Sequence, residues 1–145
     1  MAKIKIVNTS GLELPQYSTP HSAGMDVRAA VDSPVTIMPG ERRLIPTGLR
    51  VQLPDGFELQ MRPRSGLALK RGVTLLNSPG TIDADFRGEI GVIIINHSDE
   101  SFTVERGDRI AQMVLASYER ICWDETDSLD DSERGDGGFG HSGVK

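Results

Sequence analysis

Two carboxylates, an arginine and an aromatic ring lie close together in residues 80–88. Apolar and charged side chains alternate there, with Ile82, Ala84 and Phe86 in one row and Asp83, Asp85 and Arg87 in the other. This two-residue period predicts a β-ribbon, whose carboxylate row could serve a small-molecule site. On this segment alone, a plain polar hairpin tip is the slightly better explanation, because Asp and Gly are ordinary turn residues.

A second candidate site begins at Arg64 and Ser65, where the β-like alternation stops. Ser65 can cap a short helix that runs through Leu69, and Gly72 can end it. A capped helix start offers unpaired backbone N–H groups, and the guanidinium of Arg64 adds a fork of donors. This combination suits phosphate, although a connecting helix with an exposed arginine explains it equally well.

Three further features could carry chemistry. Asp26 follows a glycine turn and could hold a metal ion through water, but an ordinary turn residue is the simpler explanation. Gln112 lies in an apolar strand, where its amide needs a partner. Residues 133–143 are rich in glycine, so their backbone could wrap an anion, but by itself the segment is explained by default as a disordered terminus. Arg134 and Phe139 within them favour a lid, one residue for charge and one for stacking.

Short alternating segments punctuated by Gly and Pro must position these residues. They predict strands over residues 3–7, 35–38, 44–48, 49–53, 57–62, 90–95, 102–104 and 109–115. Residues 90–95 are apolar throughout, so we expect a strand buried on both faces. The pattern predicts an all-β fold: a sandwich, a jelly roll or a small barrel, with one short helix.

Composition excludes several classes of function. The 145 residues suit one domain without a membrane-spanning segment or signal peptide. A net charge of −5 without a basic stripe argues against a nucleic-acid partner. The single cysteine, Cys122, excludes an intramolecular disulfide and suits a reducing cytoplasm. The three histidines are too scattered for a zinc site. We expect a β domain over residues 1–123 and an acidic, then Gly-rich, flexible arm over residues 124–145.

Taken together, five segments in order resemble the bacterial homotrimeric dUTPases: residues 23–26, 63–68, 80–88, 107–112 and 134–140. Each segment is a weak signal by itself, but together they span nearly the whole chain. The resemblance implies a jelly-roll-like fold and a homotrimer whose active sites are shared between subunits. It also implies Mg²⁺-dependent hydrolysis of dUTP to dUMP and pyrophosphate. That reaction limits uracil incorporation into DNA and supplies dUMP for dTMP synthesis.

The resemblance also assigns roles to individual residues. Asp83 would activate the attacking water, and Asp26 would hold Mg²⁺ through water. Phosphate would be bound by Arg64, Ser65 and Gly66, with Gln112 on phosphate or an ordered water. Asn77 and the backbone of Gly80, Thr81 and Ile82 would read uracil. From the arm, Arg134 would clamp the γ-phosphate, Phe139 and Gly140 would cover the base, and His141 and Ser142 would close on the phosphates.

Phe86 departs from the family pattern, in which many members have Tyr. A phenyl ring can still pack against deoxyribose, but the hydroxyl and its hydrogen bond are lost, which puts part of the sugar discrimination in doubt. A backbone hairpin can match the acceptor–donor–acceptor edge of uracil, whereas cytosine would leave a desolvated group unpaired. The absence of a Gly-Lys-Ser/Thr phosphate loop is no objection, because helix start, metal and arm would hold the phosphates.

Two alternatives stay open at this point. A dCTP deaminase-like enzyme of the same fold would release ammonia from the base, although such chains are generally longer and lack the Phe-containing arm. A non-catalytic trimeric β module would bind a nucleotide or a protein without turnover. The presence of Asp83, Asp26 and the arm together weighs against this second alternative.

Overall fold

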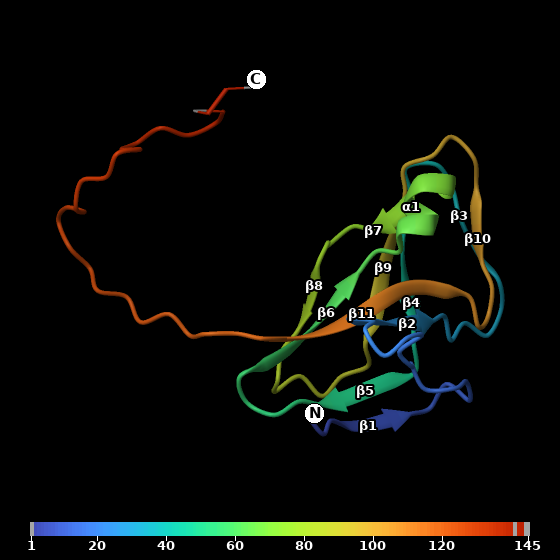
Figure 1. Ribbon diagram of the computed structural model, residues 1–145. Coiled ribbons are helices and arrows are strands. Elements are labelled where there is room, and N and C mark those ends of the chain that lie inside the picture. Colours follow the sequence, from blue (N-terminus) through green and yellow to red (C-terminus); the bar gives the residue numbers. More distant parts are fainter. Residues whose placement is uncertain (1, 141, 144–145) are drawn as a thin grey trace.

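The computed structural model describes residues 2–140 and 142–143 and is almost entirely β (Figure 1). The strands are β1 (Lys5–Asn8), β2 (Gly24–Arg28), β3 (Val35–Ile37), β4 (Arg42–Pro46), β5 (Leu49–Gln52), β6 (Phe57–Arg62), β7 (Val73–Leu75), β8 (Gly80–Ile82), β9 (Gly91–Asn96), β10 (Phe102–Val104) and β11 (Arg109–Ser117). The one helix in this part of the chain is α1 (Ser65–Arg71). The expected all-β class with one short helix is therefore confirmed.

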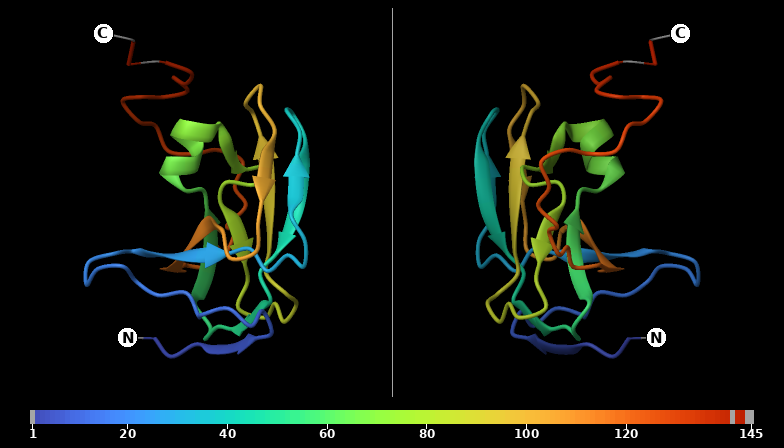
Figure 2. Two further views of the ribbon diagram at one scale, coloured as in Figure 1. Left: turned by 90° about the vertical axis from the view of Figure 1, so that its right-hand side faces the viewer. Right: turned by 90° about the vertical axis from the view of Figure 1, so that its left-hand side faces the viewer.

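The strands form four antiparallel groups around one core. The largest sheet has the order β2-β11-β6-β8, and a second sheet has the order β4-β9-β7. Two pairs, β1-β5 and β10-β3, complete the body, and the views in Figure 2 show these groups stacked across the core. Neighbours in a sheet are distant in the chain, as in a jelly roll, so the fold unites residues from remote segments.

The two-residue period gives the core its side chains. In β6, Leu59 and Met61 are 2% exposed, and their neighbours along the strand face outward. The predicted bounds of β6 and β10 agree with the structure. The expectation that residues 90–95 are buried on both faces was wrong, because Ile93 and Ile95 are only partly buried. Within the described chain, nothing covers that outer face fully.

Helix α1 begins one residue earlier than the predicted cap implies. Arg64 is the N-cap residue, without a side-chain capping hydrogen bond, so the assignment of Ser65 as the cap was wrong. The helix also continues two residues past Leu69, to Arg71. Its end is as predicted: Gly72 has φ 59°, a left-handed conformation that glycine adopts without strain. No helix among the described residues is long and apolar enough to cross a membrane.

The chain leaves the body after β11. Tyr118 donates its backbone N–H to Gly56 at 3.1 Å, and from there to residue 143 the described residues form no helix or strand. Figure 1 shows this arm extending away from the body. Nearly all its described residues are exposed, including Trp123 at 85%. The domain boundary at residue 123 and the flexibility of the arm stay predictions.

Candidate functional site

Strand pairing brings Asp26 and Gln112 together from opposite parts of the chain. Gln112 in β11 lies opposite Asp26 in β2 on one side and opposite Arg62 in β6 on the other. Residues paired across neighbouring strands share a face of the sheet. Two of the predicted site residues therefore occupy one row on the outer face of the four-stranded sheet.

Arg64 and Arg109 complete this group, which we name the Asp26 cluster: Asp26, Arg64, Arg109 and Gln112. Arg64 Nε lies 3.0 Å from Asp26 Oδ1, and its Nη1 donates to the backbone oxygen of Arg109 at 3.0 Å. Arg109 Nη1 lies 3.6 Å from Asp26 Oδ2. The Arg64 and Asp26 side chains are 31% and 34% exposed, so solvent screens the pair only in part. Each carboxylate oxygen thus faces a different guanidinium.

The amide of Gln112 finds the partner that its apolar strand requires. Its Nε2 donates to the backbone oxygen of Pro63 at 3.1 Å, directly before Arg64. A Cβ atom at Gly24 would overlap with Oε1 of Gln112. The missing side chain at Gly24 therefore lets Gln112 lie across β2, and Gln112 in turn holds the chain that leads into α1.

Ser65 and Gly66 follow Arg64 and are both exposed. The first bond of the helix runs from Ala68 N–H to the backbone oxygen of Arg64 at 3.0 Å. Among the described residues, the Ser65 hydroxyl has no hydrogen-bond partner. The first backbone N–H groups of a helix have no partner within the helix. Donors from backbone, hydroxyl and guanidinium therefore lie next to one another at this end of the sheet.

The segment around Asp83 is a turn rather than a continued ribbon. Strand β8 ends at Ile82, and Phe86 N–H bonds to the Asp83 oxygen at 3.2 Å. Ile82 and Ala84 pack against the core, whereas Phe86, the third member of the predicted apolar row, is 41% exposed. Strand β8 pairs with β6, whereas the next strand, β9, lies in the other sheet, so the segment is a polar turn between two sheets and the hairpin was wrong. Asp83 and Asp85 are exposed on this turn.

Several side-chain contacts fix the shape of this turn, which we name the tip (residues 83–88). Arg87 Nη1 donates to the backbone oxygens of Ala84 at 2.7 Å and Phe86 at 3.0 Å. A Cβ atom at Gly88 would lie 2.5 Å from Cζ of Phe86, so the ring folds back over the glycine. At the other end of the segment, the Asn77 amide lies over Gly80, where a Cβ would be 2.9 Å from its Nδ2. The tip is held by its own side chains.

Asp83 and the Asp26 cluster lie apart within one chain. Ile82 pairs with Leu59, whereas the row of Asp26 passes through Arg62 at the other end of β6. Asp83 and Asp26 are therefore about four residue steps, roughly 13 Å, apart along the strands. Three strand spacings of about 4.8 Å also separate β8 from β2 across the sheet. Asp83 borders a separate hollow, lined also by Glu58, Asp85 and Tyr118.

The arm residues are also distant from the cluster. Arg134 Nε donates to the backbone oxygen of Gly137 at 2.7 Å, and Phe139 is fully exposed. Gly140 and Ser142 are exposed as well, and His141 lies outside the described residues. The structure thus unites Asp26, Arg64, Ser65, Gly66 and Gln112, and it leaves the tip and the arm elsewhere.

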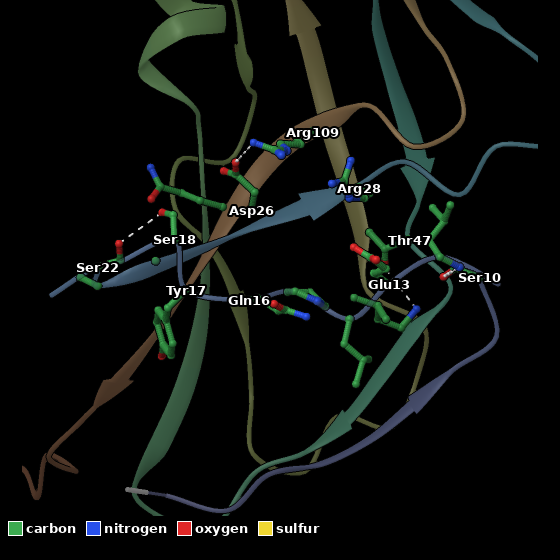
Figure 3. Close-up of a pocket in the computed structure, with 17 residues that line it drawn as sticks. Ser10, Glu13, Gln16, Tyr17, Ser18, Ser22, Asp26, Arg28, Thr47 and Arg109 are labelled. Carbon is green, nitrogen blue, oxygen red and sulfur yellow. Dashed lines mark hydrogen bonds and ion pairs between the residues drawn. The ribbon is translucent and has the colours of Figure 1, made fainter. Parts of the chain in front are cut away.

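A cavity of about 500 Å³ opens beside the Asp26 cluster (Figure 3). Figure 3 shows Asp26 and Arg109 pointing toward each other at its rim, with Glu13, Gln16 and Tyr17 on the opposite side. Sequence reasoning missed Arg109 and treated residues 12–20 only as a loop. The strand pattern around Arg109 held no signal that it would face the cluster.

The donor set restricts how a metal ion could bind. Among the described residues, no three His, Cys, Asp or Glu side chains are grouped as a metal site. Asp26 is the sole carboxylate of its cluster. A single carboxylate fits Mg²⁺, which keeps several waters and takes further oxygens from phosphate groups of a substrate.

The site combines two guanidinium groups, a helix start and one carboxylate on the face of a sheet. These groups indicate a β protein that binds an anionic, metal-associated ligand. The chain belongs to the dUTPase family, since the sequence model of that family matches residues 11–143. It is 61% identical over 140 residues to the deoxyuridine 5'-triphosphate nucleotidohydrolase of Rickettsia felis, covering 97% of this chain and 94% of that one. Identity to the protein of the same description from Rickettsia massiliae is 60%, with the same coverage.

Solved structures of related proteins have the same fold. Staphylococcus bacteriophage 80alpha dUTPase with dUpNHpp superposes with a TM-score of 0.88 at 26% identity, over 98% of this chain and 99% of that one. A mutant of that enzyme with dUpNHpp gives a TM-score of 0.87 at 25% identity, with the same coverage. The resemblance inferred from five sequence segments is thereby confirmed.

Proposed function

We propose that this protein hydrolyses dUTP to dUMP and pyrophosphate, with Mg²⁺ as its cofactor. The observation that carries the proposal is the Asp26 cluster, in a chain that belongs to the dUTPase family. Relatives at 60% and 61% identity are described as deoxyuridine 5'-triphosphate nucleotidohydrolases. The related bacteriophage enzyme has been solved with dUpNHpp.

The Asp26 cluster suits the triphosphate. The Nε–H of Arg64 donates to Asp26, and one N–H of its Nη1 donates to the Arg109 oxygen. A guanidinium carries five N–H donors, so three remain for phosphate oxygens. Ser65 adds a hydroxyl, and Gln112 holds the chain just before Arg64. Asp26 would bind Mg²⁺ through water, and the ion supplies positive charge that stabilises the phosphates.

Asp83 acts as the general base in this proposal. It takes a proton from the attacking water while the bond between the α- and β-phosphates breaks and pyrophosphate leaves. The exposed position of Asp83 on a turn held by Arg87 leaves its carboxylate open to water. Positioning of the water next to the scissile bond is the larger part of its contribution.

The protein assembles as a homotrimer with active sites shared between subunits. The separation of Asp83 from the Asp26 cluster within one chain supports this assembly, because a nucleotide bound at the cluster needs a base from elsewhere. The apolar side chains on the outer face of the second sheet, Leu44 at 69% exposure and the partly buried Ile93 and Ile95, also suit contact with another subunit.

Strand β8 and the tip that follows it select the base and the sugar. The backbone of Gly80, Thr81 and Ile82, with the Asn77 amide beside it, can match the pairing edge of uracil. Phe86 packs its ring against deoxyribose.

The arm then closes over the bound nucleotide. Arg134 binds the γ-phosphate, and Phe139 and Gly140 cover the base. His141 and Ser142 close on the phosphates.

Pyrophosphate release from a panel of nucleotides tests the proposal. We expect release from dUTP that requires Mg²⁺ and far less release from dCTP, dTTP and UTP. Ammonia release from dCTP would identify a deaminase instead, and binding of dUTP without turnover would identify a nucleotide-binding module. In a reducing cytoplasm, which the exposed Cys122 suits, the reaction keeps uracil out of DNA and supplies dUMP.

A further inference from the structure

Strand β11 contains an irregularity next to the Asp26 cluster. It pairs with β2 at Arg109 opposite Arg28 and then at Ala111 opposite Val27, so two residues of β11 correspond to one of β2. Such an extra residue is a β-bulge, which interrupts the alternation of side chains and re-aims those on either side of it. The extra residue is Ile110, two positions before Gln112.

The bulge changes which face Arg109 occupies. In a regular strand, residues separated by three positions point to opposite faces, so Arg109 would point away from Gln112 and into the core. In the structure, Ile110 and Ala111 are both buried, at 2% and 0% exposure, and the Arg109 side chain is 53% exposed. The bulge therefore places Arg109 and Gln112 on one face, next to Asp26.

Arg109 contacts both members of the Asp26–Arg64 pair. Its backbone oxygen accepts a hydrogen bond from Arg64 Nη1 at 3.0 Å, and its own Nη1 lies 3.6 Å from Asp26 Oδ2. With Oδ2 turned to Arg109, Oδ1 faces Arg64 Nε at 3.0 Å. Among the described residues, Asp26 and the Arg109 oxygen are the hydrogen-bond partners of the Arg64 guanidinium, so these contacts determine where it points.

We infer that Arg109 is a positioning residue that orients the Asp26 carboxylate and, through it, the guanidinium of Arg64 toward the triphosphate. The inference rests on the proposed function and adds a residue that acts without touching the nucleotide. Its side chain also balances the charge of Asp26, which leaves Arg64 with positive charge for phosphate. Misplacement of a binding group by about 1 Å can reduce turnover up to about 100-fold, so the effect is measurable.

A double-mutant cycle tests this role. Arg109→Gln removes the guanidinium and leaves the backbone oxygen in place. We expect kcat/KM for dUTP to fall about 10-fold, with partial recovery in Arg109→Lys, which keeps the charge but not the fork. In an Arg64→Gln background the same change should have a clearly smaller effect, because the part of its action that passes through Arg64 is already lost. Independent, multiplicative losses would overturn the inference, and so would full activity of Arg109→Gln.

A matched control and a second readout separate this inference from the proposed function. Arg43→Gln is the control: Arg43 lies in β4, in another sheet, and its exposed guanidinium pairs with Glu41 at 2.7 Å. This change should alter neither activity nor thermal midpoint. In ¹⁵N-labelled protein, the Nε–H signal of Arg64 should be protected from solvent exchange. Its protection should fall in Arg109→Gln and persist in Arg43→Gln. A wild-type protein that does not hydrolyse dUTP would overturn the proposed function, whereas an unchanged Arg64 signal in Arg109→Gln would overturn the inference.

Discussion

The side-chain amide of Gln112 lies directly over the Cα of Gly24, across the gap between β11 and β2. A Cβ atom at Gly24 would overlap with Oε1 of Gln112 and would lie 3.3 Å from Cγ2 of Val114. The absence of a side chain at one residue thus determines the position of the other. Because Gln112 donates to the Pro63 oxygen, its position also determines where the chain lies just before Arg64.

Gly24→Ala is therefore expected to damage activity more than stability. The methyl group must push Gln112 aside, which weakens its bond to Pro63 and shifts Arg64, and we expect kcat/KM for dUTP to fall about 10-fold or more. Steady-state kinetics and a thermal midpoint measure the two effects. In a Gln112→Ala background the same change should be nearly neutral. A large effect there would mean that Gly24 acts through the strand rather than through Gln112.

Asp83→Asn should retain nucleotide binding and lose turnover. An amide cannot accept the proton of the attacking water, so we expect a loss of about 10²–10⁴-fold in kcat, the usual contribution of a positioned base. Single-turnover hydrolysis and calorimetric binding of dUpNHpp measure the two properties. Asp85→Asn, on the same exposed turn, is the matched control and should remain active. Nearly unchanged turnover in Asp83→Asn would assign the base to another carboxylate.

The ring of Phe86 offers a test of sugar selection. Its contact with Gly88 holds it over the tip, and Phe86→Ala would remove it and open space for a 2′-hydroxyl group. We expect the ratio of UTP to dUTP hydrolysis to rise about 10-fold in Phe86→Ala and to stay close to the wild-type value in Phe86→Tyr. Competition between the two nucleotides measures this ratio. If the ratio is the same in the Ala variant, other groups reject the ribose.

Complementation between two inactive variants tests the shared site. Asp26→Asn and Asp83→Asn each disable one part of the site, and neither should be active by itself. Unfolded together in equal amounts and refolded as mixed trimers, they should recover about a quarter of the wild-type activity, because that fraction of subunit junctions pairs an intact Asp26 with an intact Asp83. Lack of recovery, with trimers present in sedimentation, would place both residues in one subunit's site.

The sequence predicts the elements of this fold better than their relations. The alternation in residues 57–62 and 102–104 predicts β6 and β10 with their observed bounds, because period and turn residues are local properties. The apolar run of β9 misled the burial prediction, since apolar side chains on a partly exposed face have the same composition as those on a core face. Ser65 was taken for a cap from its residue type, although Arg64 has the extended conformation of the N-cap.

In the candidate site, too, the sequence predicts the individual residues better than their relations in space. Asp26, Arg64 and Gln112 were identified by type, but their meeting depends on the pairing of β2 with β11, which no local pattern encodes. Arg109 was missed because a regular strand would turn it toward the core, and the bulge that reverses it has no glycine or proline to reveal it. The resemblance to dUTPases named the residues, and only the fold relates them in space.

Truncation after Asp131 tests whether the arm is part of the active site. The described residues beyond Tyr118 form no helix or strand, and hardly any is buried, so their removal should leave the thermal midpoint almost unchanged. Turnover of dUTP should fall on the order of 10³-fold, the lower end of what an arginine on a triphosphate transition state contributes. Arg134→Gln in the full chain should reproduce most of this loss, and Lys145→Gln is the control.

A fluorescence experiment gives a direct readout of the arm. Phe139→Trp is placed in a Trp123→Phe background, because Trp123 is the sole native tryptophan and is 85% exposed. The new indole should change its fluorescence on binding dUpNHpp and much less on binding dCTP. A truncated protein with full activity would show that the Gly-rich segment has no part in catalysis.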